Sequence, residues 1–404
     1  MKRILALVLL CILLTVPFAS AAEPSVPCKA SGACRSPAIT NDAFAVQLYG
    51  ELAKKPGNLF FSPYSISNAV AMARAGARGE TAKEIDRTLH FPSDQARLNE
   101  AFKRVNKDLP TLAKRDGVRL DIANGLALTG GAVKKSFETV LKDDYDAEIF
   151  SGGVGQINDW VRRKTGGKIP SILDRLPPGS ACVILNAIYF KGLWKSQFSR
   201  KNTRNAPFHV SSTRQATAPL MYQRGRFKLL EAKNFQAVSM DYKGGDLSMV
   251  ILLPEKTEGL ADFEKSMTPQ KLGRWLQSVD TQPFRQIDLY VPKFRMETSY
   301  DLKSPFQNLG MRKPFEPGAD FSGMGEGLWI GQIKHKCFLK VDEKGTEAAA
   351  ATATRMMTAV RRPLTIPVFR ADHPFIFLIR DNRNGLILFL GRVTDPTRGA
   401  AERK

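Results

Sequence analysis

The chain has 404 residues, of which 43% are hydrophobic and 25% are charged. This composition excludes a disordered chain and indicates a folded protein with a sizeable core. The formal net charge is +21. A surface with this excess of positive charge attracts polyanions, unless the basic residues are only scattered for solubility.

Residues 1–21 have the features of a signal peptide. Lys2 and Arg3 precede the apolar run Ile4–Val16, and Ala19-Ser20-Ala21 matches an A-x-A cleavage site. The apolar run is short for a membrane span, so a membrane anchor is the weaker interpretation. We expect secretion, to the extracellular space or, in a Gram-negative host, to the periplasm. Removal of residues 1–21 takes away two basic and no acidic residues, which leaves a charge of +19.

The N-terminal tail, residues 22–39, contains Cys28 and Cys34. In an oxidising compartment these two can form one local disulfide, and whether they pair is left open. Cys182 and Cys337 lie in apolar strand patterns and are expected to be buried free thiols. There is no CxxC and no zinc-ligand spacing. We therefore expect no metal and no cofactor.

Helix signals gather in the first part of the chain. Phe44, Leu48 and Leu52 recur at helical spacing after Thr40-Asn41-Asp42, and Ser62-Pro63 opens a second helix. A capping box at Thr81 and Glu84 predicts a third helix. Ser93 is expected to cap a fourth, whose apolar stripe is Leu98, Phe102, Val105 and Leu109. Further helices are expected around 136–144, 155–164 and 268–279.

Strand signals dominate the later part. Val183–Phe190 is a continuous apolar run, as in a strand that is covered on both faces. Two runs flank the turn Lys243-Gly244-Gly245-Asp246, which predicts a hairpin. The full set of expected strands is Val183–Phe190, Ala237–Tyr242, Leu247–Leu253, Ile287–Phe294, Cys337–Val341, Phe375–Ile379 and Leu386–Leu390. Early helices and late strands predict an α+β fold with at least one large sheet.

The motifs of common enzymes are missing. The four histidines do not form HExxH, and there is neither a GxSxG elbow nor a Walker loop. Members of a Ser-His-Asp triad need not be adjacent, so the sequence alone leaves a triad open. An ordinary enzyme is nevertheless the disfavoured class.

Residues 343–354, EKGTEAAAATAT, lie in a connection of about thirty residues between two strand signals. As an extended strand, one face would carry Thr346, Ala348, Ala350, Thr352, Thr354, Met356 and Thr358, which are small or uncharged. The other face would carry both charges, Glu347 and Arg355. The segment thus has two interpretations, an exposed protease-tolerant loop or a strand that can enter an existing sheet.

Six motifs, in order along the chain, resemble those of the serpin family. They are Asn58–Ser67, Leu185–Trp194, Val291–Phe294, Glu343–Thr352, Phe369–Phe375 and Phe389–Pro396. The resemblance covers residues 40–397 and implies a single domain with three β-sheets, eight to nine helices and an exposed reactive-centre loop at about 343–367.

The resemblance also implies a function. The chain is expected to be a monomeric serine-protease inhibitor that acts as a suicide substrate. Its target cuts the loop, and the cut loop then inserts into the main sheet and traps the acyl-enzyme. A cysteine protease is a second candidate target. The alternatives are a non-inhibitory serpin, acting as a carrier, storage protein or chaperone, and a polyanion-binding serpin.

Residue roles are carried over by position. The family's shutter, a polar cluster under the opening sheet, is resembled by Ser62, Ser65, Asn186 and His335. The other interpretation of Asn186 and His335 is a buried pair that only satisfies its own hydrogen bonds. The hinge residues are Glu343, Gly345, Thr346, Glu347, Ala348, Ala349, Ala350, Ala351 and Thr352.

The reactive bond is expected at Ala359-Val360, counted from the hinge. That bond suits an elastase-like or subtilisin-like protease. Arg361 or Arg362 is the alternative and suits a trypsin-like protease. The helix after Ser93 carries Arg97, Lys103, Arg104 and Lys107 opposite its apolar stripe. By place, these resemble a heparin-binding face, and a solvated basic face is the competing interpretation.

Overall fold

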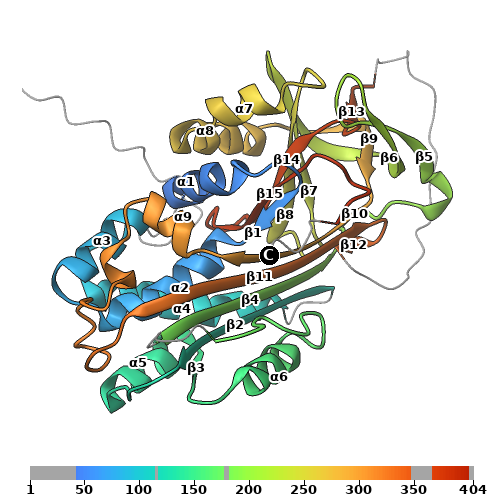
Figure 1. Ribbon diagram of the computed structural model, residues 1–404. Coiled ribbons are helices and arrows are strands. Elements are labelled where there is room, and N and C mark those ends of the chain that lie inside the picture. The colour runs from blue at the N-terminus through green and yellow to red at the C-terminus, as the bar shows by residue number, and fades with distance from the viewer. Residues whose placement is uncertain (1–41, 114–116, 177–181, 347–365, 400–404) are drawn as a thin grey trace, which may run out of the picture. The chain divides into compact units, whose positions relative to one another are not determined.

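The computed structural model describes residues 42–113, 117–176, 182–346 and 366–399 (Figure 1). The signal-peptide segment, the tail with Cys28 and Cys34, and residues 347–365 lie outside this part. Among the described residues, none of the helices is long and apolar enough to cross a membrane.

The described part contains nine α-helices and two short 3₁₀ turns. They are α1 (Asp42–Ala53), α2 (Pro63–Gly76), α3 (Gly79–Leu89), α4 (Gln95–Ala113), α5 (Lys135–Tyr145), α6 (Val154–Lys164), α7 (Leu260–Ser266), α8 (Pro269–Asp280), α9 (Lys303–Asn308), η1 (Arg200–Asn202) and η2 (Lys313–Phe315). The expected helices at 136–144, 155–164 and 268–279 are confirmed as α5, α6 and α8. Ser62 caps α2 by accepting from the Ser65 amide, and Pro63 occupies its first turn, as predicted.

Two of the predicted helix starts are wrong. Arg78, not Thr81, precedes α3, because the Thr81 hydroxyl accepts from the Asp320 amide. Glu84 instead accepts from the amides of Arg312 and Lys313. The two residues of the predicted capping box therefore connect α3 by hydrogen bonds to the loop segments at 312–313 and 320. At α4, Asp94 rather than Ser93 accepts from the Arg97 amide.

Fifteen strands complete the fold. They are β1 (Leu59–Phe61), β2 (Val118–Leu128), β3 (Ala147–Phe150), β4 (Cys182–Leu193), β5 (Arg204–His209), β6 (Gln215–Glu231), β7 (Phe235–Asp241), β8 (Leu247–Pro254), β9 (Phe284–Pro292), β10 (Phe294–Asp301), β11 (Ile330–Asp342), β12 (Gly345–Thr346), β13 (Val368–Arg370), β14 (Phe375–Asp381) and β15 (Ile387–Val393), all within the described residues. The predicted run Ile287–Phe294 is wrong as one strand, because the chain leaves β9 at Pro292 and Phe294 starts β10 in the other sheet.

The described strands pair into two sheets. The six-stranded sheet has the order β10-β11-β12-β4-β2-β3, and the nine-stranded sheet follows β1-β15-β14-β8-β7-β6-β9-β13, with β5 on β6. The long strand β6 pairs first with β9 and then with β7. The described strands therefore form two hydrogen-bonded sheets, where the resemblance implied three, because β6 links β9 to β7 within one sheet. The fold is α+β, as expected.

The six-stranded sheet is buried on both faces along most of β4. On one face, Ile184, Ile188 and Phe190 of β4 join the main core with α2. On the other, Leu185 and Tyr189 pack in a second core with the residues of α6 (Figure 1). This two-sided burial explains the continuous apolar run in β4.

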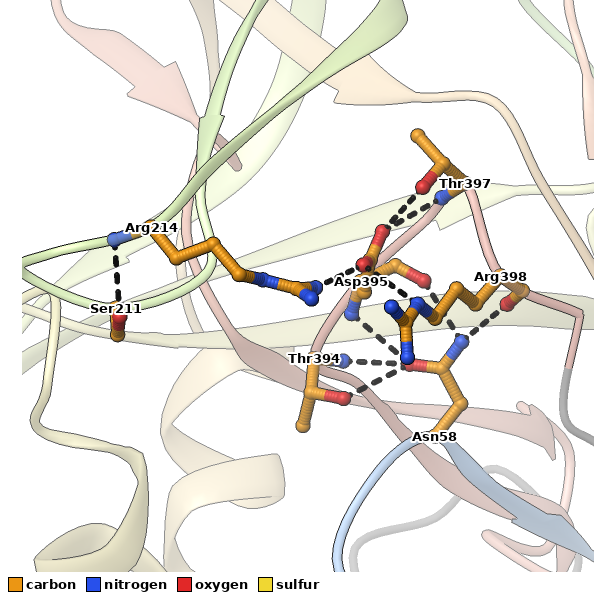
Figure 2. Close-up of polar contacts among 7 residues, drawn as sticks. All are labelled: Asn58, Ser211, Arg214, Thr394, Asp395, Thr397 and Arg398. Carbon is orange, nitrogen blue, oxygen red and sulfur yellow. Dashed lines mark hydrogen bonds and ion pairs between the residues drawn. The ribbon is translucent and has the colours of Figure 1, made fainter.

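A network around Asn58 fixes the described C-terminal segment (Figure 2). The Asn58 side chain accepts from the amides of Thr394 (2.8 Å) and Asp395 (3.0 Å). It donates to the carbonyl oxygens of Asp395 (2.8 Å) and Arg398 (2.5 Å). Asp395 in turn accepts from the Arg214 guanidinium and from the Thr397 hydroxyl. One asparagine therefore connects the start of β1 to the chain after β15.

We expect Asn58→Ala to lower the free energy of unfolding by about 3 kcal/mol, because it leaves buried main-chain groups of residues 394–398 without partners. Thermal unfolding followed by circular dichroism measures the effect. Asn384→Ala is the matched control: Asn384 receives one local bond, from the Leu386 amide (2.9 Å). Equal shifts for the two variants would contradict this role of Asn58.

Candidate functional site

The candidate site begins where β11 ends. After Asp342 the chain turns through Glu343 and Lys344, and Gly345–Thr346 form the short strand β12. β12 is antiparallel to both neighbours: Thr346 pairs with Val341 of β11 and with Gly192 of β4. Over the preceding part of the two strands, β11 and β4 pair directly with each other, from Ile330 with Cys182 to Phe338 with Tyr189. β12 therefore lies between β11 and β4 at their carboxyl ends, on the right of Figure 1.

Glycine is required at position 345. Its φ is +154°, and a Cβ atom there would stand 2.0 Å from the carbonyl oxygen of Gly192. The main chain passes too close to β4 for any side chain. Because residue 345 has no side chain, the main chain can lie between β11 and β4 at this close distance.

The turn before β12 is held by polar contacts. Glu343 is 4% exposed and pairs with Lys293 at 3.0 Å, and it also accepts from the Thr203 hydroxyl at 3.0 Å. Burial tends to raise the pKa of Glu343, but its hydrogen bonds and the Lys293 charge hold that pKa below its usual value. The carboxylate thus stays ionised and fixes the turn at neutral pH.

Two aromatic residues, Trp194 and Tyr242, contact the hinge turn and β12. The Trp194 amide donates to the Lys344 carbonyl at 2.8 Å, and the Trp194 indole donates to the Asp342 carbonyl at 3.0 Å. The Tyr242 ring stacks on Trp194, and its hydroxyl lies 2.9 Å from the Thr346 hydroxyl. The Thr346 side chain is fully buried. Sequence reasoning missed Tyr242, whose only signal was its place at the end of a strand.

The four residues named as a shutter lie together. The Ser62 amide donates to His335 Nε2 (3.1 Å), so the proton of the neutral imidazole is on Nδ1, which donates to Asn186 Oδ1 (2.6 Å). Asn186 Nδ2 donates to Ser65 Oγ (2.6 Å) and to Asn124 Oδ1 (2.7 Å). Asn124 is a member that the sequence reasoning did not find. Because His335 and Asn186 are register partners on β11 and β4, this bond bridges the two strands between which β12 lies.

We expect acid to lower the stability of the fold through His335. Burial lowers the pKa of His335 to about 3, against an unfolded value of about 6.5. Its contribution to stability is therefore complete above about pH 6.5 and is lost as the pH falls toward the folded pKa, by about 1.4 kcal/mol per pH unit. Melting midpoints between about pH 7.5 and about pH 5 measure this slope.

The control for this pH effect is His335→Asn, which lacks the titrating imidazole. Its melting midpoint should depend less on pH than that of the parent protein. The same slope in both proteins would contradict the assignment of the effect to His335.

The basic face of α4 is only partly free. Lys103 pairs with Asp144 at 2.9 Å, and Arg104 lies 3.6 Å from Glu100. Arg97 and Lys107 are exposed. Two of the four named cations are thus matched by carboxylates, and a polyanion role for this face stays a prediction.

Several predicted residues lie outside the described part of the chain: the hinge residues 347–352, the bonds around Ala359, Val360, Arg361 and Arg362, and Cys28 with Cys34. Cys182 and Cys337 are buried free thiols, as expected. In the described ranges, no group of three or more His, Cys, Asp or Glu side chains is arranged to hold a metal ion.

The comparisons with known proteins settle the family. The family model "Serpin (serine protease inhibitor)" matches residues 39–396. This chain belongs to the serpin family. It is 37% identical to the leukocyte elastase inhibitor of Sus scrofa, over 88% of this chain and 98% of that protein. It is also 37% identical to an uncharacterized serpin-like protein of Thermococcus kodakarensis, over 89% of this chain and 85% of that protein.

Among solved structures, human thyroxine-binding globulin complexed with thyroxine matches this serpin with a TM-score of 0.80 and 29% identity, over 89% of this chain and 98% of that one. The family is one of protease inhibitors, so this serpin is an inhibitor-type protein and not an enzyme.

Proposed function

We propose that this serpin is a secreted inhibitor that traps a serine protease by inserting its cut loop between β11 and β4. The observation that carries the proposal is β12, which already lies antiparallel between those strands. A loop that continued from Thr346 in the same direction would need no change of register to go further.

The registers on the two sides agree with each other. Continued from β12, the register would place Ala349 opposite both Phe338 and Tyr189, which pair with each other in this structure. Three residues later, Thr352 would lie opposite His335 and Asn186. A threonine hydroxyl suits the one polar pair on the inward face, and the inserted strand would replace the His335–Asn186 bond that it breaks.

The inward face also fits in size and charge. In this register Ala348 would lie beside Leu339 and Phe190, and Ala350 beside Cys337 and Ile188, all fully buried. Small uncharged side chains enter such a space without a desolvation cost. Each new main-chain hydrogen bond contributes about 1 kcal/mol net.

The target we propose is an elastase-like or subtilisin-like protease, cut at Ala359-Val360. The small side chain of Ala359 and the similarity to a protein named as a leukocyte elastase inhibitor support it. Arg361 or Arg362 stays the alternative bait, for a trypsin-like protease.

The test mixes the protein with pancreatic elastase, subtilisin and trypsin in separate reactions. We expect a covalent adduct with elastase or subtilisin that survives denaturing electrophoresis. The released peptide should begin at Val360; a start at Arg362 or Pro363 would move the bait to the arginine pair. Cleavage by all three without an adduct would refute trapping.

That refuting outcome would favour a non-inhibitory role. A carrier is the specific candidate, because the structurally similar thyroxine-binding globulin is named as a thyroxine complex. Secretion is tested separately, by N-terminal sequencing of protein exported from a bacterial host. The proposal expects Ala22 as the first residue, and retention of the intact N-terminus inside the cell would contradict it.

A further inference from the structure

A cavity of about 340 Å³ opens where β6 leaves β9 and continues along β7. Arg226 and Phe227 of β6 form part of its wall, with Ser239 of β7 and Phe284, the first residue of β9. Its volume is in the range of pockets that bind small molecules. None of its lining residues belongs to the hinge, to the shutter or to the basic face of α4.

The lining favours a flat apolar ligand. Phe227 is 5% exposed, whereas Phe284 is 45% exposed and is one of two large apolar side chains that stand out in water in the described part of the chain. The Phe284 ring lies at the edge of a cavity rather than on open surface. Aromatic side chains in such a place provide contact area for an aromatic ring.

The charge at the cavity is positive. Lys195, Arg226 and one carboxylate, Asp241, line the cavity, and Asp241 lies 3.3 Å from the Lys195 ammonium. Arg226 donates to the Phe284 carbonyl at 3.2 Å, and this bond holds its guanidinium near the exposed ring. The lining residues thus carry one more cation than carboxylate, which favours an anionic ligand.

The cavity wall is continuous with the residues that hold the hinge. Lys195 and Ser196 follow Trp194, which donates to Lys344 and Asp342. Phe198, two residues after Ser196, donates its amide to the Glu343 carbonyl at 2.8 Å. These bonds cross from the chain after β4 to the turn after β11.

The far side of the cavity is connected in the same way. Asp241 precedes Tyr242, whose hydroxyl contacts Thr346 at 2.9 Å. The Asp241 carbonyl also accepts from the Lys195 amide at 2.9 Å, which ties the two walls together. A ligand between these walls would stabilise both sets of contacts to the hinge turn, those of residues 194–198 and that of Tyr242.

We propose that the cavity binds a small aromatic anion, and that the bound anion slows separation of β4 from β11 by stabilising residues 194–198 against the hinge turn. The effect on loop insertion rests on the proposed function. The binding site and the bracing of residues 194–198 do not, since both are measurable on the intact protein without any protease.

The probe is 8-anilinonaphthalene-1-sulfonate, an aromatic sulfonate whose fluorescence rises on burial. Titration of the full mature protein should give one saturable site. Phe284→Ser should weaken binding about tenfold or more, and Arg226→Gln about fivefold, as expected for loss of a stacked ring and of a partly exposed charge contact. The controls are Val368→Ser, the other exposed apolar residue, and Arg274→Gln, an exposed arginine of α8; both should bind as the parent does.

Hydrogen–deuterium exchange with and without the probe then tests the bracing. Peptides that cover residues 194–198 should exchange several-fold more slowly with the probe bound, and should do so in the parent but not in Phe284→Ser. Binding that all four variants share, or no binding, would overturn the site. Binding at the site with unchanged exchange would overturn the bracing. A failure to form protease adducts would leave both readouts intact and would count against the proposed function alone.

Discussion

Ala348→Arg is expected to turn the protein from an inhibitor into a substrate. In the register set by β12, residue 348 would enter between Leu339 and Phe190, which are both fully buried. A guanidinium group in that space costs several kcal/mol. In the proposed mechanism insertion competes with hydrolysis of the acyl-enzyme, and each 1.4 kcal/mol on the insertion barrier changes the ratio of the two outcomes about tenfold. The number of inhibitor molecules consumed per protease inactivated should therefore rise by about 100-fold.

The control for this prediction is Glu347→Arg, which adds the same side chain one residue earlier. Residue 347 would lie opposite Lys340 and Lys191, on the other face of the sheet. Lys340 is exposed and Lys191 half-buried, so a charge there stays hydrated and the stoichiometry should change by less than about fivefold. The uncut variants should melt at similar temperatures. Equal effects of the two arginines would show that the face of the inserted strand does not matter.

Asn186→Ala is expected to open the closed sheet. The substitution removes the acceptor of the His335 Nδ1 proton and the donor to Ser65 and Asn124, all within the buried interior. Buried groups left without partners cost about 1–3 kcal/mol each. Because β4 and β11 lose their polar bridge, spontaneous conversion to a form with inserted, uncut loop should be at least about tenfold faster. Loss of inhibitory activity on mild heating, together with a new species of higher melting midpoint, measures it.

Asn58→Ala is the matched control, since it also removes several buried hydrogen bonds but connects β1 to the chain after β15. It should lower the melting midpoint without faster conversion. If both variants convert at the same rate, the Asn186 cluster has no special part in holding the sheet closed, and conversion follows general instability.

Local sequence patterns were sufficient to predict an element where its burial follows a regular period. The run in β4, the hairpin at Lys243–Asp246 and the Ser62-Pro63 cap are all visible in short windows. The capping box at Thr81 and Glu84 failed because two distant loop segments compete for its oxygen atoms. Such tertiary hydrogen bonds leave no local signal. The 17-residue strand β6 was missed because its burial alternates irregularly as it passes from one partner to another.

The site divides in the same way. Ser62, Ser65, Asn186 and His335 were found only through the resemblance, since they lie far apart in the sequence. Their hydrogen-bond order, and Asn124 as a further member, required the structure. The small-residue face from Thr346 onward was visible in the sequence, but its direction was not. The structure shows the direction for Thr346 alone, whose side chain is buried beside Tyr242.

A structure of the protein cut once in its loop tests loop insertion most directly. We predict a new strand between β11 and β4 that continues β12, with Ala349 opposite Phe338 and Tyr189 and with Thr352 beside His335 and Asn186. In that structure the Nδ1–H of His335 would no longer reach Asn186. A cut chain in which β11 and β4 remain paired through Phe338 and Tyr189, with the His335–Asn186 bond intact, would contradict the mechanism.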